Sequence, residues 1–119
     1  MIVDTSAIIA IILGEPGADE LFDALTSVPS ARLSAASLVE CSIVGRRLGP
    51  AQRQQLRRLL DELGVEIAPV TVTQAELAVA AHERFGVGSG SQARLNFGDC
   101  FTYALAAETG EPLLFVGDD

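Results

Sequence analysis

The sequence contains no lysine and no tryptophan, and its 119 residues include only one histidine and two cysteines. Cys41 and Cys100 lie inside apolar segments with helical spacing. A single pair of cysteines in an intracellular chain does not indicate a disulfide scaffold. We therefore predict that both cysteines are free thiols that pack as small buried hydrophobic groups.

Long hydrophobic runs are also missing. The apolar run at residues 7–13 is much shorter than the roughly 18 residues that a membrane-spanning helix needs. A secretory signal starts with a basic segment, but no lysine or arginine precedes Arg32. The sequence therefore predicts a cytoplasmic protein with no membrane partner.

Basic residues are few and are concentrated in one part of the chain. Eight basic residues stand against 16 acidic ones, so the formal net charge is −8, which argues against nucleic-acid binding by simple electrostatic attraction. We call the five arginines within residues 46–58 the arginine cluster: Arg46, Arg47, Arg53, Arg57 and Arg58. The cluster predicts either an exposed helical face paired with Asp61 and Glu62, or a local basic surface that contacts a partner.

Short apolar segments alternate with segments of helical spacing along the chain. We predict strands at residues 1–4, 31–34, 65–70 and 113–116. We predict helices at residues 5–13, 18–27, 37–48, 51–63, 73–85 and 98–109, and the longest polar loop at residues 86–96. This alternation is typical of βαβ units, and it predicts one α/β domain over residues 1–119, with a parallel sheet flanked by helices.

Acidic residues lie at the ends of several predicted elements. Asp4 follows the first strand, and Asp118 and Asp119 follow the fourth, at the edge of a parallel sheet where ligands bind. Glu40 lies in the third predicted helix, and Asp99 begins the last one. Mg²⁺ and Mn²⁺ prefer oxygen ligands, and a metal-dependent phosphodiesterase needs several converging carboxylates without His, Cys or Lys. These acids are therefore candidate ligands of a divalent metal.

Each acid also has a purely structural interpretation. Asp4 could cap the first helix, and Ser37-Leu38-Val39-Glu40 fits a capping box. Asp99 suits the positive end of the last helix, and Asp118 and Asp119 could form a solvated turn. Asp4 and Asp99 precede dense apolar helices, however, so we expect both near the core. Buried carboxylates repel one another and are costly without a cation.

Several segments, taken in order along nearly the whole chain, resemble a PIN-domain protein, most closely the VapC toxins of bacterial VapBC toxin–antitoxin pairs. The matching segments are Asp4-Thr5-Ser6-Ala7, Ala36-Ser37-Leu38-Val39-Glu40, Asn96-Phe97-Gly98-Asp99-Cys100-Phe101 and Pro112-Leu113-Leu114-Phe115-Val116-Gly117-Asp118-Asp119. The resemblance implies a three-layer α/β fold with a parallel sheet of four to five strands. Members usually continue for another short strand, so we expect that strand to be missing here.

The resemblance also implies an activity and partners. It implies a Mg²⁺- or Mn²⁺-dependent endoribonuclease toxin that cuts specific RNA, often tRNA or ribosomal RNA, and so inhibits translation. It further implies a homodimer that is inhibited by a cognate VapB-like antitoxin. The matching metal ligands and catalytic acids are Asp4, Glu40 and Asp99, with Asp118 or Asp119 as the fourth acid. The supporting residues are Thr5 or Ser6, which would orient the first carboxylate, and Asn96.

Basic residues near these segments have two interpretations. Arg94 could contact an RNA phosphate or a nearby acid, or could be a solvated loop residue. Arg46 and Arg47 could contact RNA or the antitoxin. Two other functions fit the same sequence: a PIN-type metal nuclease that acts on DNA, and a non-catalytic α/β binding domain in which the acids only cap helices. Branched DNA substrates and a metal titration distinguish these alternatives.

Overall fold

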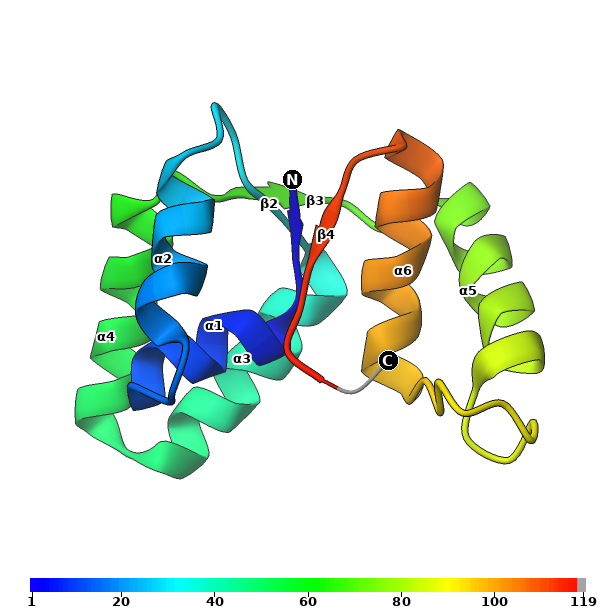
Figure 1. The fold of residues 1–119 in the computed structure, drawn as a ribbon, viewed down its shortest axis with the longest axis horizontal. Helices are drawn as coiled ribbons and strands as arrows, with labels where there is room; N and C mark the ends of the chain where they lie inside the picture. Colours follow the sequence, from blue (N-terminus) through cyan, green and yellow to red (C-terminus); the bar gives the residue numbers. More distant parts are fainter. Residues whose placement is uncertain (118–119) are drawn as a thin grey trace.

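A computed structural model describes residues 1–117 of the chain (Figure 1). The strands are β1 (Ile2–Val3), β2 (Arg32–Ser34), β3 (Glu66–Ala68) and β4 (Leu113–Leu114). The helices are α1 (Thr5–Leu13), α2 (Ala18–Thr26), α3 (Ala35–Leu48), α4 (Pro50–Glu62), α5 (Val72–Phe85) and α6 (Phe97–Thr109). The predicted order of helices and strands is therefore confirmed.

The strands form a parallel sheet in the order β3-β2-β1-β4. Figure 1 shows α1 to α4 on one side of the sheet and α5 and α6 on the other. The central strand β1 is fully buried, as expected for a parallel sheet that helices cover on both faces. The predicted α/β fold is confirmed, with four strands in the described part of the chain.

Several predicted boundaries were wrong by a few residues. The third strand ends at Ala68 rather than at residue 70, because Pro69 has no amide hydrogen to donate to a neighbouring strand. The third helix begins at Ala35 rather than at residue 37, because the Ser34 side chain accepts a hydrogen bond from the Ala36 amide and caps it. Glu40 is therefore an interior residue of α3, and the capping box predicted for it was wrong.

The main core lies between the sheet and α1 to α4. It includes buried residues of β1 and α1 together with Leu56 and Leu59, the inward-facing leucines of α4. Each such side chain contributes roughly 1.5–3 kcal/mol to folding through its burial. Cys41 and Cys100 are buried free thiols, as predicted. Burial raises the pKa of the Cys41 thiol to about 11 and also raises the pKa of Cys100.

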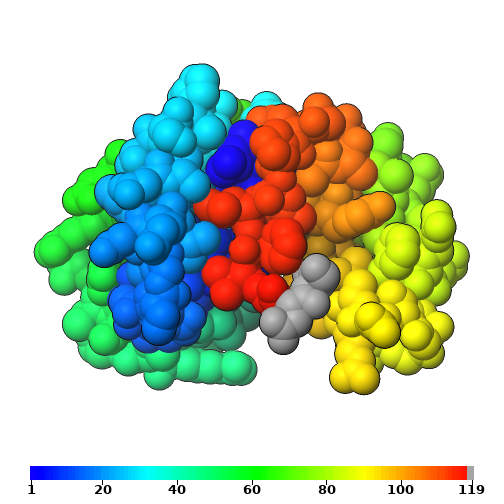
Figure 2. Space-filling view, viewed as in Figure 1, coloured from blue at the N-terminus to red at the C-terminus, as the bar shows by residue number. Residues whose placement is uncertain are grey.

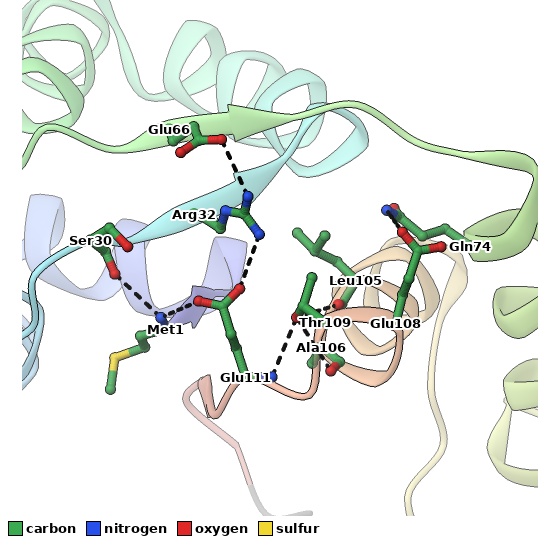
Figure 3. Close-up of polar contacts among 10 residues, drawn as sticks. All are labelled: Met1, Ser30, Arg32, Glu66, Gln74, Leu105, Ala106, Glu108, Thr109 and Glu111. Atoms are coloured by element: carbon green, nitrogen blue, oxygen red, sulfur yellow. Dashed lines mark hydrogen bonds and ion pairs between the residues drawn. The ribbon is translucent and has the colours of Figure 1, made fainter.

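The amino ends of the strands are held by an ion-pair network (Figure 3). Glu111 accepts hydrogen bonds from the Met1 amino group at 2.9 Å and from the Arg32 guanidinium at 3.1 Å. Arg32 also lies 3.4 Å from a carboxylate oxygen of Glu66. These contacts join residues at or just before the starts of the four strands, at the opposite end of the sheet from Asp4.

Between residues 1 and 117 no helix is both long enough and apolar enough to cross a lipid bilayer.

Candidate active site at the carboxyl ends of the strands

Asp4 lies between the end of β1 and the start of α1. It is 8% exposed, and its carboxylate accepts a hydrogen bond of 3.0 Å from the Ser6 amide, so it caps α1. Its own amide donates to the Leu114 carbonyl of β4 at 2.9 Å. The helix start thus fixes the carboxylate, while two adjacent strands fix the backbone that carries it. The predicted capping role of Asp4 is confirmed.

Asp99 lies in the first turn of α6, where it forms a capping box with Asn96. The Asp99 amide donates to Asn96 Oδ1 at 2.9 Å, and the Asn96 amide donates to Asp99 Oδ2 at 2.9 Å. This reciprocal pair confirms the predicted position of Asp99 at the positive end of the helix. It also gives the supporting residue Asn96 a defined task, because Asn96 holds the Asp99 carboxylate in one orientation.

Asp4 and Asp99 line the same cavity, whose volume is about 370 Å³. Ser6, Thr102 and Tyr103 are among the other residues that line it. The described residues around this cavity include no arginine and no histidine. Carboxylate oxygens are the ligands that Mg²⁺ and Mn²⁺ prefer, so two acids that line one cavity can hold such a cation.

Glu40 reaches the same region from α3. A Cβ atom built on Gly98 would overlap Glu40 Oε2 and would lie 2.8 Å from Glu40 Cδ. The Glu40 carboxylate therefore rests on the residue that precedes Asp99. Within residues 1–117, no three Asp, Glu, His or Cys side chains are close enough to form a ready metal-binding group. The structure thus places Asp4, Glu40 and Asp99 at one end of the sheet, but their carboxylates are not close enough together to bind one metal ion as they stand.

The hydroxyls predicted to orient the first carboxylate have other partners in the structure. Thr5 Oγ1 donates to the Ser37 carbonyl at 3.4 Å, and Ser6 Oγ accepts a hydrogen bond of 2.9 Å from the Val116 amide. Asp4 is oriented by the Ser6 backbone amide instead. Figure 2 shows the segment after β4, in red, lying between the surface of α1 and α2 and that of α6.

The candidates for the fourth acid, Asp118 and Asp119, lie outside the described residues.

Sequence analysis missed a buried hydroxyl pair beneath the acids. Ser37 Oγ and Thr102 Oγ1 lie 3.1 Å apart and join α3 to α6. Ser37 precedes Glu40 by three residues, and Thr102 follows Asp99 by three residues, so each hydroxyl shares a helix face with an acid. This three-residue spacing was visible in the sequence. A search for a polar residue three positions from each candidate ligand could have found the pair.

Arg94 lies in the chain between two residues that line the same cavity. It is exposed, its neighbours Ala93 and Leu95 line the cavity, and its φ angle is 47°. A residue other than glycine seldom adopts this left-handed conformation, and such strain is concentrated at functional sites. Hydrogen bonds between Leu95 and residues 85 and 87 close the base of the loop that carries Arg94.

The arginine cluster borders a groove between α3 and α4, with a volume of about 600 Å³. Arg46, Arg53 and Arg57 line it beside apolar residues that include Val39 and Ile43, whereas Arg47 does not. None of the ion pairs found within residues 1–117 involves an arginine of the cluster. The predicted pairing with Asp61 and Glu62 is therefore absent from the described residues, and a mixed basic and apolar surface is present.

The sequence is similar to known proteins over its whole length. The sequence model of the PIN domain matches residues 1–119. The chain is 52% identical to ribonuclease VapC42 of Mycobacterium tuberculosis, in an alignment that covers 100% of this chain and 92% of that protein. It is 51% identical to ribonuclease VapC28 of the same organism, with coverage of 100% of this chain and 90% of that protein.

Two solved structures share the fold. A chain of a toxin–antitoxin complex from Klebsiella pneumoniae aligns with a TM-score of 0.71 and 20% identity, over 94% of this chain and 82% of that chain. VapC20 of Mycobacterium tuberculosis, described as a toxin that cleaves the sarcin–ricin loop, aligns with a TM-score of 0.71 and 21% identity, over 99% of this chain and 90% of that chain. At these identities the likeness shows a common fold.

Proposed function

The chain belongs to the VapC group of the PIN-domain family, and from this premise we propose that it is a divalent-metal-dependent endoribonuclease toxin. Its substrate is a specific RNA, such as a tRNA or a ribosomal RNA, which it cleaves in the cytoplasm to inhibit translation. The full-length alignment with ribonucleases VapC42 and VapC28 supports this proposal.

The observation that carries the proposal is the cavity shared by Asp4 and Asp99. Mg²⁺ keeps several waters and is usually bound through one or two carboxylates, so a pair of acids that line one cavity fits this ion. Glu40, which rests on Gly98, adds a third carboxylate nearby. The donor set consists of carboxylate oxygens, which suits Mg²⁺ or Mn²⁺.

In this mechanism Asp4 and Asp99 would hold the metal, and Glu40 would complete the acidic side of the site. When bound, the metal would lower the pKa of a water molecule and offset the charge of the phosphate. The capping contacts hold the Asp4 and Asp99 carboxylates before the metal binds, so they need little rearrangement. Asp118 or Asp119 is proposed as a fourth acid.

Arg94 is the proposed contact for an RNA phosphate. Its chain neighbours Ala93 and Leu95 line the cavity, and the protein has a net charge of −8, so a basic residue here would offset local repulsion of the substrate. The planar guanidinium of arginine can donate two parallel hydrogen bonds to a phosphate. Two backbone hydrogen bonds of Leu95 close the base of the loop that carries this side chain.

The groove between α3 and α4 is the proposed binding surface for a VapB-like antitoxin. It combines exposed apolar residues, such as Val39 and Ile43, with Arg46, Arg53 and Arg57. An amphipathic peptide with acidic groups matches this composition, since its apolar face can enter the groove while its carboxylates meet the arginines. Arg47 lies on the same helix but outside the groove lining, so it is a weaker candidate contact.

We also propose a homodimer, for which the outer face of α5 and α6 is the best candidate. Val79 of α5 is 60% exposed, Phe97 of α6 is 78% exposed, and both line one hollow between these helices. Apolar residues that gather on an exposed surface mark a protein interface.

The test of the function is the Asp99→Asn variant. Asparagine keeps the shape of the side chain and an oxygen for the Asn96 amide, but it removes the charge that binds a metal. We expect RNA cleavage with Mn²⁺ to fall by about 100-fold or more, because the metal contributes several kcal/mol and each 1.4 kcal/mol is worth about tenfold. The rise in melting temperature on adding Mn²⁺ should also be lost.

Asp19→Asn is the matched control, because Asp19 is an exposed acid in the first turn of α2. It should cleave RNA as the wild type does. An Asp99→Asn protein that folds and cleaves RNA at the wild-type rate would refute the mechanism. Preference of the wild type for branched DNA would indicate a DNA nuclease, and a melting temperature unaffected by Mn²⁺ would indicate a binding domain in which the acids only cap helices.

A further inference from the structure

Gly98 occupies a place in α6 where its own backbone gives no reason for glycine. It lies in the first turn of the helix, between Phe97 and Asp99, and it is absent from the glycines with positive φ angles. Alanine fits a helical backbone better than glycine does. Glycine at position 98 therefore destabilises the helix locally, so the reason for a glycine here must be the residues that surround it.

The neighbour that excludes a side chain is Glu40. A Cβ atom on Gly98 would overlap Glu40 Oε2, and it would lie 2.8 Å from Cδ and 2.9 Å from Oε1 of the same side chain. All three of these nearest atoms belong to the carboxylate of one acid. The space that Gly98 leaves open is thus filled by the Glu40 carboxyl group.

We propose that Gly98 is a positioning residue, whose missing side chain admits the Glu40 carboxylate to the first turn of α6 beside Asp99. This inference rests on the proposed function, in which Glu40 and Asp99 both belong to the metal site. The first turn of a helix carries unpaired amides and a partial positive charge, which favours a carboxylate at this place. A methyl group on residue 98 would displace that carboxylate from this position.

The consequence for a Gly98→Ala variant is specific. The group that must move is the end of a flexible side chain, so the fold can accommodate alanine by displacing Glu40. The helix gains a better helix former, so the melting temperature of the metal-free protein should stay the same or rise. Metal affinity and RNA cleavage should fall, because a supporting contact that orients a ligand is typically worth about 10–100-fold.

Gly45→Ala is the matched control. Gly45 is also a helical glycine without a positive φ angle, and a Cβ atom there would lie 3.4 Å from Leu56 Cδ2 and 3.7 Å from the Arg53 Cα. These are ordinary van der Waals distances. This variant makes the same glycine-to-alanine change in a helix without meeting an acid, so Mn²⁺ affinity and RNA cleavage should match the wild type.

The decisive experiment combines Gly98→Ala with Glu40→Asp. Aspartate is one methylene shorter, so its carboxylate can avoid the new methyl group. If the residues act through each other, the double variant should lose less Mn²⁺ affinity and less activity than the product of the two single losses. Mn²⁺ affinity is measured from melting temperature against metal concentration, and cleavage is measured separately on an RNA transcript.

The outcomes separate the inference from the function on which it rests. Gly98→Ala with wild-type Mn²⁺ affinity and cleavage would overturn the inference, as would single losses that simply multiply in the double variant. Glu40→Gln tests the underlying site independently. If Glu40→Gln is inactive while Gly98→Ala is normal, the site stands and the role of Gly98 is wrong. If Glu40→Gln is fully active, the assignment of Glu40 itself fails.

Discussion

The hydrogen bond between Ser37 and Thr102 allows a quantitative test of how α3 and α6, the helices that carry Glu40 and Asp99, are held together. Ser37 is 1% exposed and Thr102 is 2% exposed, and their hydroxyl oxygens lie 3.1 Å apart. Thr102→Val keeps the outline of the side chain but leaves the buried Ser37 hydroxyl facing a methyl group. Loss of one partner from a buried hydrogen bond costs about 1–3 kcal/mol, so we expect the free energy of unfolding to fall by that amount.

Ser37→Ala makes the reciprocal change and should destabilise the protein to a similar degree. The double variant should lose less than the sum of the single losses, because removing both hydroxyls leaves no buried donor without its partner. We expect a coupling free energy of about 1 kcal/mol. Urea denaturation of the four proteins measures it, and Thr102→Ser, which retains the hydroxyl, is the conservative control.

A double variant whose loss equals the sum of the two single losses would show that the hydroxyls do not interact, and the structural argument would fail. The bond also has a functional consequence, since it joins the helices that carry Glu40 and Asp99. RNA cleavage by the single variants should therefore fall below that of Thr102→Ser. Equal cleavage by all of these proteins would show that the bond contributes only to stability.

Two further predictions concern titratable groups outside the cavity. The hydrogen bond from the Met1 amino group lowers the pKa of Glu111, and the hydrogen bond from Arg32 acts in the same direction. The stability that the Glu111 carboxylate contributes is therefore present above about pH 4.3, the ordinary pKa of glutamate, and is lost as the pH falls through the lowered pKa. Glu111→Gln should therefore lower the melting temperature by a few degrees at pH 7, and its effect should shrink progressively as the pH falls further below about 4.3. An effect that stays the same down to pH 2 would contradict this. The Cys41 thiol has a pKa of about 11 and is fully buried, so thiol reagents at pH 8 should label it only as fast as the protein unfolds. Labelling of Cys41 in the native protein at the rate of an exposed cysteine would refute that expectation.

The fold could be predicted because its signals are local. Apolar segments alternate with helical spacing, and the structure contains the same elements in the same order. The predicted ends of helices and strands were less accurate where a residue that is not part of the apolar pattern determines the end. Pro69 ends β3 early, and the Ser34 side chain starts α3 before Ser37, so the capping box that the sequence suggested around Glu40 does not form.

The candidate site could be predicted only in part. The capping roles of Asp4 and Asp99 follow from their own neighbours in sequence, and both appear in the structure. The contact of Glu40 with Gly98 could not be predicted, because it depends on how closely α3 approaches α6. The same holds for the Ser37–Thr102 bond, which joins residues 65 positions apart in sequence.

The capping bonds of Asp4 and Asp99 have a consequence for how the family can lose its chemistry. Asparagine caps a helix about as well as aspartate does, so exchanging one carboxylate oxygen for an amide group at each position would leave both helix starts intact. Under the proposed mechanism such a chain would no longer bind the metal, but it would keep the groove between α3 and α4 that we propose for the antitoxin. Two substitutions that preserve both helix caps would therefore separate the proposed binding of the antitoxin from the proposed cleavage of RNA.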